Sequence, residues 1–199
     1  MFSFTQSHHR RSLRLKGYDY SQAGAYFVTV CVYNRECLLG NVLDGEVVLN
    51  RHGEISKEEW LRSRMIRKEM EFDEFVIMPN HVHGIVIRRD SLDDVGATGH
   101  CDFAGATGRS PLQTTRGPGK RSLGSFAGGF KSAVAKRINL ERGTPGEPVW
   151  QHNYYEHVIR DDEELCRVRQ YIVDNPIQWD QDRENPVGVS RKPIERWQV

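Results

Sequence analysis

Hydrophobic positions along the chain form two kinds of pattern: unbroken strand-like runs and stripes at helical spacing. Residues 25–33 are mostly β-branched and aromatic, which predicts a buried strand. Two short apolar runs within 37–49 flank Asp44-Gly45, a dipeptide typical of a tight hairpin turn. Over 55–70, apolar residues recur every three or four positions among charged ones, which predicts an amphipathic helix.

The second half of the chain continues the alternation of strands and helices. Pro79-Asn80 divides the apolar stretch 74–89, and because proline cannot donate a ladder hydrogen bond, a second hairpin is expected there. Residues 123–140 carry one apolar side and predict a helix, and 149–160 predict a strand. A last helix is expected to begin at an Asp161 or Asp162 cap and to run to about Asn175, where Pro176 ends it.

This order of elements predicts an α+β fold. Without the small hairpin at 37–49, it reads β-α-β-β-α-β plus a terminal helix, the ferredoxin-like arrangement of an antiparallel sheet with helices on one face. The 199 residues favour a single domain. We expect a basic N-terminal arm at 1–20, the domain at 21–180 with a flexible Gly- and Ser-rich loop at 91–119, and a polar tail at 181–199.

Composition excludes several classes of protein. Hydrophobic residues make up 38% of the chain, which is enough for a packed core. No stretch reaches the length of about 18 apolar residues that a membrane span needs, and the N-terminus lacks the apolar region of a secretory signal. The four cysteines, at 31, 37, 101 and 166, form no C-x-x-C pair, so a zinc ribbon and a disulfide scaffold are not expected. A cytoplasmic protein with reduced thiols is the simplest interpretation.

The net charge of +1 conceals a segregated distribution. Lysine and arginine are concentrated at 1–16 and 109–142, whereas acids dominate 155–185. Two basic segments on one face could bind a polyanion such as a nucleic acid. The alternative is that these charges lie on solvated loops and helix surfaces.

His81 and His83 are the first candidate site residues. Side chains two apart on a strand point to the same face, so both imidazoles would project together while Val82 faces away and Gly84 leaves room for a neighbour. Neutral imidazole is a good ligand for divalent metals, although a metal site needs at least a third ligand. The alternative is a pair of half-buried histidines satisfied by hydrogen bonds.

Tyr171 and Asn175 are the second candidate pair. They lie four residues apart in the last predicted helix and therefore share a face. An amide oxygen suits a hard cation, and a tyrosine beside that cation could attack a bound phosphate. Asn175 could equally be an ordinary helix end before proline, and Tyr171 could simply pack. Tyr154 and Tyr155 are rival nucleophiles on the same evidence.

These motifs together resemble a known family. M-P-N-H-V-H-G at 78–84 with Y-x-x-x-N-P at 171–176 is similar to the single-tyrosine HUH transposases, and most of all to the REP-associated tyrosine transposases, named for repetitive extragenic palindromes. The segments 14–30, 34–40, 123–139 and 148–165 also resemble that family, so the resemblance covers roughly 10–180.

The resemblance implies a role for each candidate residue. His81 and His83 match the metal ligands, Asn175 the polar residue that completes the metal site, and Tyr171 the nucleophile. The implied cofactor is Mg²⁺ or Mn²⁺. Attack on a phosphodiester would give a 5′-phosphotyrosine intermediate and a free 3′-OH, which can later reverse the reaction and join strands. The implied activity is that of a single-stranded DNA endonuclease and strand transferase on hairpin or palindromic repeats.

The implied partner is single-stranded or hairpin DNA, bound by a monomer or homodimer without a membrane. Expected backbone contacts are Arg10, Arg11, Arg14, Lys16, Lys120, Arg121, Lys131, Lys136 and Arg137. His152 and His157 are interpreted as strand histidines satisfied by hydrogen bonds, with support of the site as the alternative. Two rival functions remain: a catalytically idle hairpin-binding regulator, and a metallohydrolase that uses water and does not need Tyr171.

Overall fold

The computed structural model describes residues 23–89, 121–182 and 184–186, and its elements follow the expected order. The strands are β1 (Gly24–Cys31), β2 (Gly40–Leu43), β3 (Glu46–Leu49), β4 (Met70–Met78), β5 (His81–Arg88) and β6 (Tyr155–Ile159), and the α-helices are α1 (Arg51–Ile66), α2 (Leu123–Arg142) and α3 (Asp162–Asp174). Short 3-10 helices occupy Tyr33–Arg35 and Trp179–Gln181. The expected arm at 1–20, the loop at 91–119 and, of the tail at 181–199, residue 183 and residues 187–199 lie outside the described residues.

Four strands form one sheet in the order β4-β5-β1-β6, and every neighbouring pair is antiparallel. Strands β2 and β3 form a separate hairpin. Asp44 and Gly45 both have positive φ at its turn, which matches the right-handed twist of the two strands. The predicted ferredoxin-like α+β fold is therefore confirmed.

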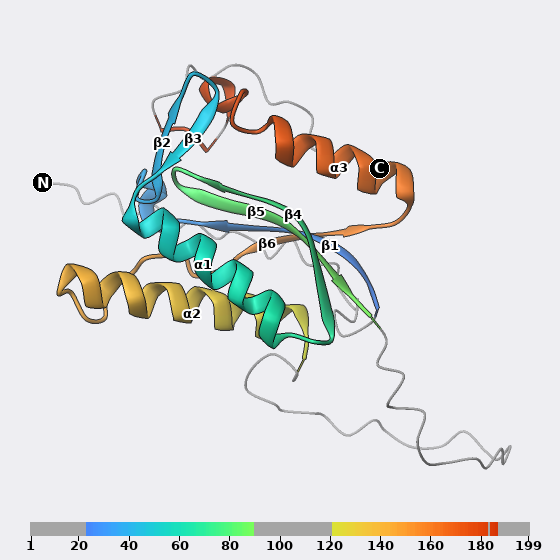
Figure 1. Cartoon of the computed structure of the whole chain (residues 1–199), viewed down its shortest axis with the longest axis horizontal. Coiled ribbons are helices and arrows are strands. Elements are labelled where there is room, and N and C mark those ends of the chain that lie inside the picture. The colour runs from blue at the N-terminus through green and yellow to red at the C-terminus, as the bar shows by residue number, and fades with distance from the viewer. Residues whose placement is uncertain (1–22, 90–120, 183, 187–199) are drawn as a thin grey trace, which may run out of the picture.

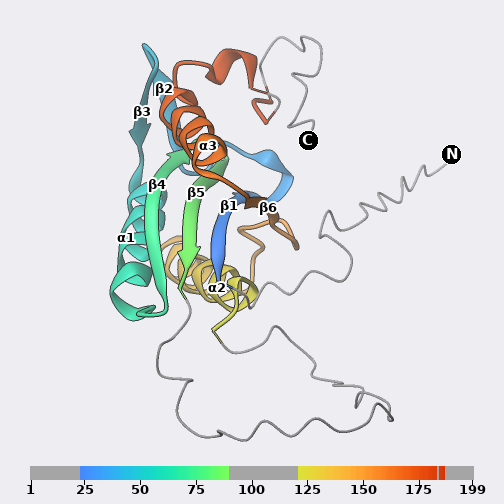
Figure 2. The same cartoon turned by 90° about the vertical axis from the view of Figure 1, so that its right-hand side faces the viewer.

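The two helices of the ferredoxin-like unit, α1 and α2, share one face of the sheet, as predicted, and the additional C-terminal helix, α3, lies across the opposite face (Figures 1 and 2). The larger core cluster, which includes Tyr26, Val82 and Phe126, fills the α1/α2 side, and a smaller one with Phe27, Ile85 and Ile172 lies under α3. The face under α3 is the one that carries the histidines.

Side-chain caps explain where the helices begin. The Asn50 side chain accepts hydrogen bonds from the backbone N–H groups of His52 and Gly53, so α1 starts at Arg51, before the first residue of the predicted apolar stripe. Ser122 caps α2 and Asp161 caps α3 in the same way. The caps satisfy backbone donors that have no partner within the helix.

Two expected boundaries were wrong. The helix predicted over 55–70 ends at Ile66, and Met70 opens β4 instead, because a buried methionine fits a strand run as well as a helical stripe. The strand predicted over 149–160 shortens to β6, and Trp150 forms only an isolated bridge with Val32. Within the described part of the chain, no helix combines the length and apolarity needed to cross a bilayer.

Candidate active site

The two histidines of β5 project from the same face of the sheet, as their spacing predicts. Their rings lie 4.3 Å apart between centroids, and both side chains are buried. His83 pairs with Thr29 across β1, and His81 pairs with Cys31 at the strand end. Gly84 faces the other way, where Trp60 packs against its backbone.

His83 is held between a hydroxyl and a phenol. Its Nδ1 lies 2.8 Å from Thr29 Oγ1, and its Nε2 lies 3.5 Å from the hydroxyl oxygen of Tyr171. Phe27 stacks on the imidazole at 5.1 Å between centroids and meets the Tyr171 ring edge-on at 5.9 Å. The Thr29 contact therefore leaves Nε2 as the ring nitrogen directed toward the tyrosine.

The tautomer of His81 follows from its neighbour Asn80. Asn80 Nδ2 donates to the backbone oxygens of Arg35, at 3.0 Å, and Glu184, at 2.5 Å, which identifies Oδ1 as the acceptor end of the amide. Asn80 Oδ1 lies 2.8 Å from His81 Nδ1, so that nitrogen carries the proton. A neutral imidazole protonated at Nδ1 has its lone pair on Nε2, the form that binds a metal.

Tyr171 reaches the histidines because α3 is fastened to the sheet at several points. Val168 and Ile172 are buried in the smaller core cluster on either side of the tyrosine. Arg169 donates through Nε and Nη2 to Asp73 Oδ2, at 3.0 and 2.5 Å, and the hydrogen bond to Asp73 raises the pKa of the guanidinium. Asp73 lies where β4 shifts register against β5, a bulge that re-aims its side chain.

Asp182 joins the two histidines, and sequence reasoning missed it. Ligand atoms of His81, His83 and Asp182 all lie within 4.8 Å of one another, close enough to share one metal ion. Asn175 lies beside this carboxylate, with its Nδ2 3.3 Å from Asp182 Oδ2. Asn175 is 3% exposed, and its Oδ1 has no hydrogen-bond partner among the residues that the structure describes. No local pattern marks Asp182, which lies within the predicted polar tail.

The basic residues expected to contact DNA fall into three groups: residues outside the described part of the chain, exposed residues, and residues engaged within the fold. Arg10, Arg11, Arg14, Lys16 and Lys120 lie outside the described residues. Arg121 and Lys136 are exposed. Their role in DNA binding stays a prediction.

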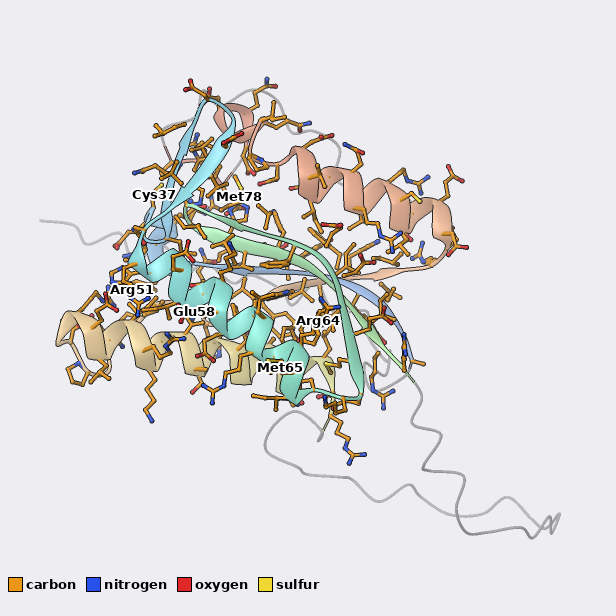
Figure 3. All side chains as sticks on the ribbon, viewed as in Figure 1. Cys37, Arg51, Glu58, Arg64, Met65 and Met78 are labelled. Carbon is orange, nitrogen blue, oxygen red and sulfur yellow. The ribbon has the colours of Figure 1, made fainter. Side chains whose placement is uncertain are left out.

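Two more of the expected DNA contacts, Lys131 and Arg137, are engaged within the fold, and their role in DNA binding also stays a prediction. Lys131 Nζ donates to the carbonyl oxygens of Gln151 and His152 at 2.6 and 2.8 Å, and burial lowers the pKa of its ammonium group. Arg137 on α2 pairs with Glu58 and Glu59 on α1. Figure 3 shows Glu58 on α1, with Arg51 nearer the start of the same helix. These two basic side chains join elements of the domain.

Tyr154, Tyr155 and His157 have structural contacts within the fold. Tyr155 packs edge-on against Phe27 at 6.5 Å, and Tyr154 packs against the larger core cluster. His157 Nε2 lies 2.6 Å from Glu164 Oε1 and thereby ties β6 to α3. His152 is exposed. Among the three tyrosines considered as nucleophiles, the hydroxyl of Tyr171 is the one placed against His83.

Comparison with known proteins gives one extensive sequence match. An uncharacterized protein of Haemophilus influenzae is 40% identical over 183 residues, which cover 88% of this chain and 93% of that protein. The chain matches no sequence profile of a known protein family.

The solved structures that are similar to this one include two transposase structures. One is a REP-associated tyrosine transposase bound to a REP hairpin, with 18% identity, a TM-score of 0.48, and coverage of 81% of this chain and 72% of that chain. The other, from Deinococcus radiodurans R1, is described as a candidate transposase; it has 16% identity, a TM-score of 0.41, and coverage of 80% of this chain and 94% of that chain.

Proposed function

We propose that this chain, which belongs to the same family as the uncharacterized Haemophilus influenzae protein, is a metal-dependent endonuclease and strand transferase for single-stranded DNA, of the REP-associated tyrosine transposase kind. The observation that carries the proposal is the position of the Tyr171 hydroxyl, 3.5 Å from His83 Nε2 and thus beside the His81–His83–Asp182 group. The proposed nucleophile and the proposed metal ligands would thus share one site, an arrangement suited to metal-assisted transesterification of a phosphodiester.

The donor set fits a divalent cation such as Mg²⁺ or Mn²⁺. His81 is held in the tautomer with its lone pair on Nε2, and Asp182 supplies a carboxylate, which hard cations prefer. A cation held there would withdraw charge from a non-bridging oxygen of the phosphate and orient the phosphorus for attack.

In the proposed reaction, the Tyr171 oxygen forms a bond to phosphorus while the bond from phosphorus to the 3′ oxygen breaks. The phenol loses its proton to solvent, and the leaving oxygen takes one up to become a 3′-OH. The 5′-phosphotyrosine link conserves the energy of the broken bond, so a 3′-OH can reverse the step and join strands. The buried faces of Phe27 and His83 hold the phenol in place throughout.

A cleavage assay on hairpin-bearing single-stranded DNA with Mn²⁺ tests this function. Wild type is expected to give a protein–DNA band that survives denaturing electrophoresis, and Tyr171→Phe is expected to fold normally and give none. Tyr155→Phe is the matched control, because it removes a hydroxyl from a neighbouring tyrosine and should leave the band in place. Cleavage by Tyr171→Phe would overturn the proposal in favour of a hydrolase that uses water. Tight hairpin binding without cleavage by wild type would favour the regulator.

A further inference from the structure

We infer that Asp182 is the third protein ligand of the metal at His81 and His83, and that the side chain of Asn80 positions both halves of this site. The inference rests on the proposed function for the presence of a metal, and it changes the expected ligand set. Residue-by-residue resemblance assigns the third position to Asn175. In the structure, the carboxylate of Asp182 lies within 4.8 Å of ligand atoms of both histidines, and Asn175 lies next to it.

Charge favours the carboxylate as ligand. His81 and His83 are 0% and 3% exposed, and two neutral imidazoles bring no charge to offset a dication in a buried place. An amide from Asn175 would bring none either. Asp182 adds the anionic oxygen that Mg²⁺ and Mn²⁺ prefer.

The carboxylate of Asp182 is held on both of its oxygens. Oδ1 accepts a hydrogen bond from the backbone N–H of Glu184 at 2.7 Å, and Oδ2 lies 3.3 Å from Asn175 Nδ2. A carboxylate has about four lone-pair positions, so two hydrogen bonds leave room for a metal ion. This support is typical of ligating carboxylates, whose orientation is set by outer hydrogen bonds. Asn175 is thus a positioning residue that acts through Asp182.

Asn80 connects the two chain segments that supply the ligands. Its Oδ1 accepts from His81 Nδ1, and its Nδ2 donates to the backbone oxygen of Glu184, which is 104 positions away in the sequence. Asn80 is 1% exposed, so both hydrogen bonds are shielded from water. An ion pair between Arg35 Nε and Glu184 Oε2 at 3.2 Å fastens the same segment from outside. One amide therefore sets the tautomer of His81 and the approach of the segment that carries Asp182.

Binding of Mn²⁺ to the full chain without DNA, measured by calorimetry, tests the ligand assignment. Asp182→Asn is expected to lower the affinity by at least about tenfold, because it removes the anionic ligand but keeps an oxygen for the Glu184 N–H. Asn175→Ala should have a smaller effect. Asp180→Asn is the matched control, because Asp180 is an exposed aspartate two positions from Asp182. The Asp180→Asn variant should bind Mn²⁺ with the affinity of wild type.

Arg35→Ala tests the positioning device without altering a ligand. It should weaken Mn²⁺ binding by no more than about fivefold, the range of a partly exposed ion pair, and Arg35→Lys should restore the affinity. Thermal unfolding of each variant checks that the fold is kept. The inference is overturned if Asp182→Asn binds Mn²⁺ like wild type, or if Asn175→Ala loses more affinity than Asp182→Asn.

The two proposals fail in different ways. A wild-type protein that forms the covalent DNA adduct while Asp182→Asn keeps full Mn²⁺ affinity disproves only the ligand assignment. A wild-type protein that binds Mn²⁺ through Asp182 but forms no adduct disproves only the proposed function. Absence of any Mn²⁺ binding by wild type disproves the ligand assignment, and the adduct assay with and without Mn²⁺ then decides the proposed function separately.

Discussion

The hydroxyl of Tyr171 lies 3.5 Å from Nε2 of His83 within a single chain. Helix α3 brings the tyrosine back over the strand that carries the histidines, and the Phe27 ring fills the space beside both. One copy of the chain therefore contains the proposed nucleophile and the proposed metal ligands together. Under the proposed function, each copy should cleave DNA with its own tyrosine.

A mixing experiment checks that expectation. Tyr171→Phe and His83→Ala are each expected to lose covalent adduct formation, and a mixture of the two should stay at background. A site built from two copies would regain adducts in the mixture, because one partner would supply the tyrosine and the other the histidine. Adduct yield on a denaturing gel distinguishes the two results.

The Arg169–Asp73 ion pair should matter for the position of Tyr171. Replacing Arg169 with Gln removes two hydrogen bonds that fasten α3 to β4, two residues from the tyrosine. We expect the single-turnover rate of adduct formation to fall on the order of tenfold, because small misplacements of a nucleophile are costly. Mn²⁺ affinity should not change, since the ligands are untouched.

Arg167→Gln is the matched control for Arg169→Gln. This substitution removes an ion pair on the same helix, in which Arg167 Nη1 lies 2.7 Å from Glu163 Oε1. The side chains of Arg167 and Glu163 are both more than half exposed. The adduct formation rate of Arg167→Gln should equal that of wild type. Equal rates in Arg167→Gln and Arg169→Gln would contradict the positioning role of the Asp73 contact.

Gly84 should tolerate no side chain. A Cβ atom there would lie 2.3 Å from Trp60 Cζ2, and Trp60 is itself enclosed by four phenylalanine rings. We expect Gly84→Ala to reduce the free energy of unfolding by about 1–3 kcal/mol, the usual cost of overpacking a core. Urea denaturation measures the change.

Gly128→Ala makes the same chemical change as Gly84→Ala, but it is expected to raise the free energy of unfolding. Gly128 lies in α2, and within the described part of the chain no heavy atom of a neighbouring side chain or segment lies within 4 Å of a Cβ added there. Alanine should therefore raise the free energy of unfolding by about 0.5–1 kcal/mol through helix propensity. Destabilisation by both variants to the same extent would mean that Trp60 is not the cause at Gly84.

Glu164 gives a pH-dependent prediction. Burial raises the pKa of this carboxyl, but hydrogen bonds from His157 and the backbone N–H of Arg160 outweigh it, so the pKa is lowered overall. Folding therefore favours the carboxylate, and this stabilisation is complete above the ordinary glutamate pKa of about 4.3. It is lost as the pH falls through the lowered pKa of the folded state.

Glu164→Gln should thus be less stable than wild type at pH 7, and the difference should shrink as the pH falls below about 4. Thermal unfolding at a series of pH values measures it. Glu163→Gln, at the exposed neighbouring position, is expected to show little difference at any pH. A Glu164→Gln deficit that persists undiminished in acid would show that the contribution is packing rather than charge.

Local spacing alone was enough to place several parts of the site. Side chains along a strand alternate between its two faces, so H-x-H in a strand puts His81 and His83 on one face regardless of the neighbouring sequence. A helix repeats every 3.6 residues, so Tyr171 and Asn175 share a side of α3. The Asp44-Gly45 turn and the Asp161 cap are likewise local, because each depends on a few adjacent backbone groups.

Contacts between distant segments were decided by the tertiary structure. Asp182 lies in the site because Asn80 and Arg35 hold its segment, and no periodic pattern encodes a hydrogen bond across 104 positions. Lys131 and Arg137 looked like surface charges in the sequence, since only packing shows whether a long basic side chain meets solvent or a buried partner. The sequence by itself determined the elements and the face that bears the histidines, because these follow from backbone periodicity. Only the tertiary structure shows that the carboxylate of Asp182 lies with the two histidines, and that the side chains of Lys131 and Arg137 are engaged elsewhere in the domain, because these contacts join segments far apart in the sequence.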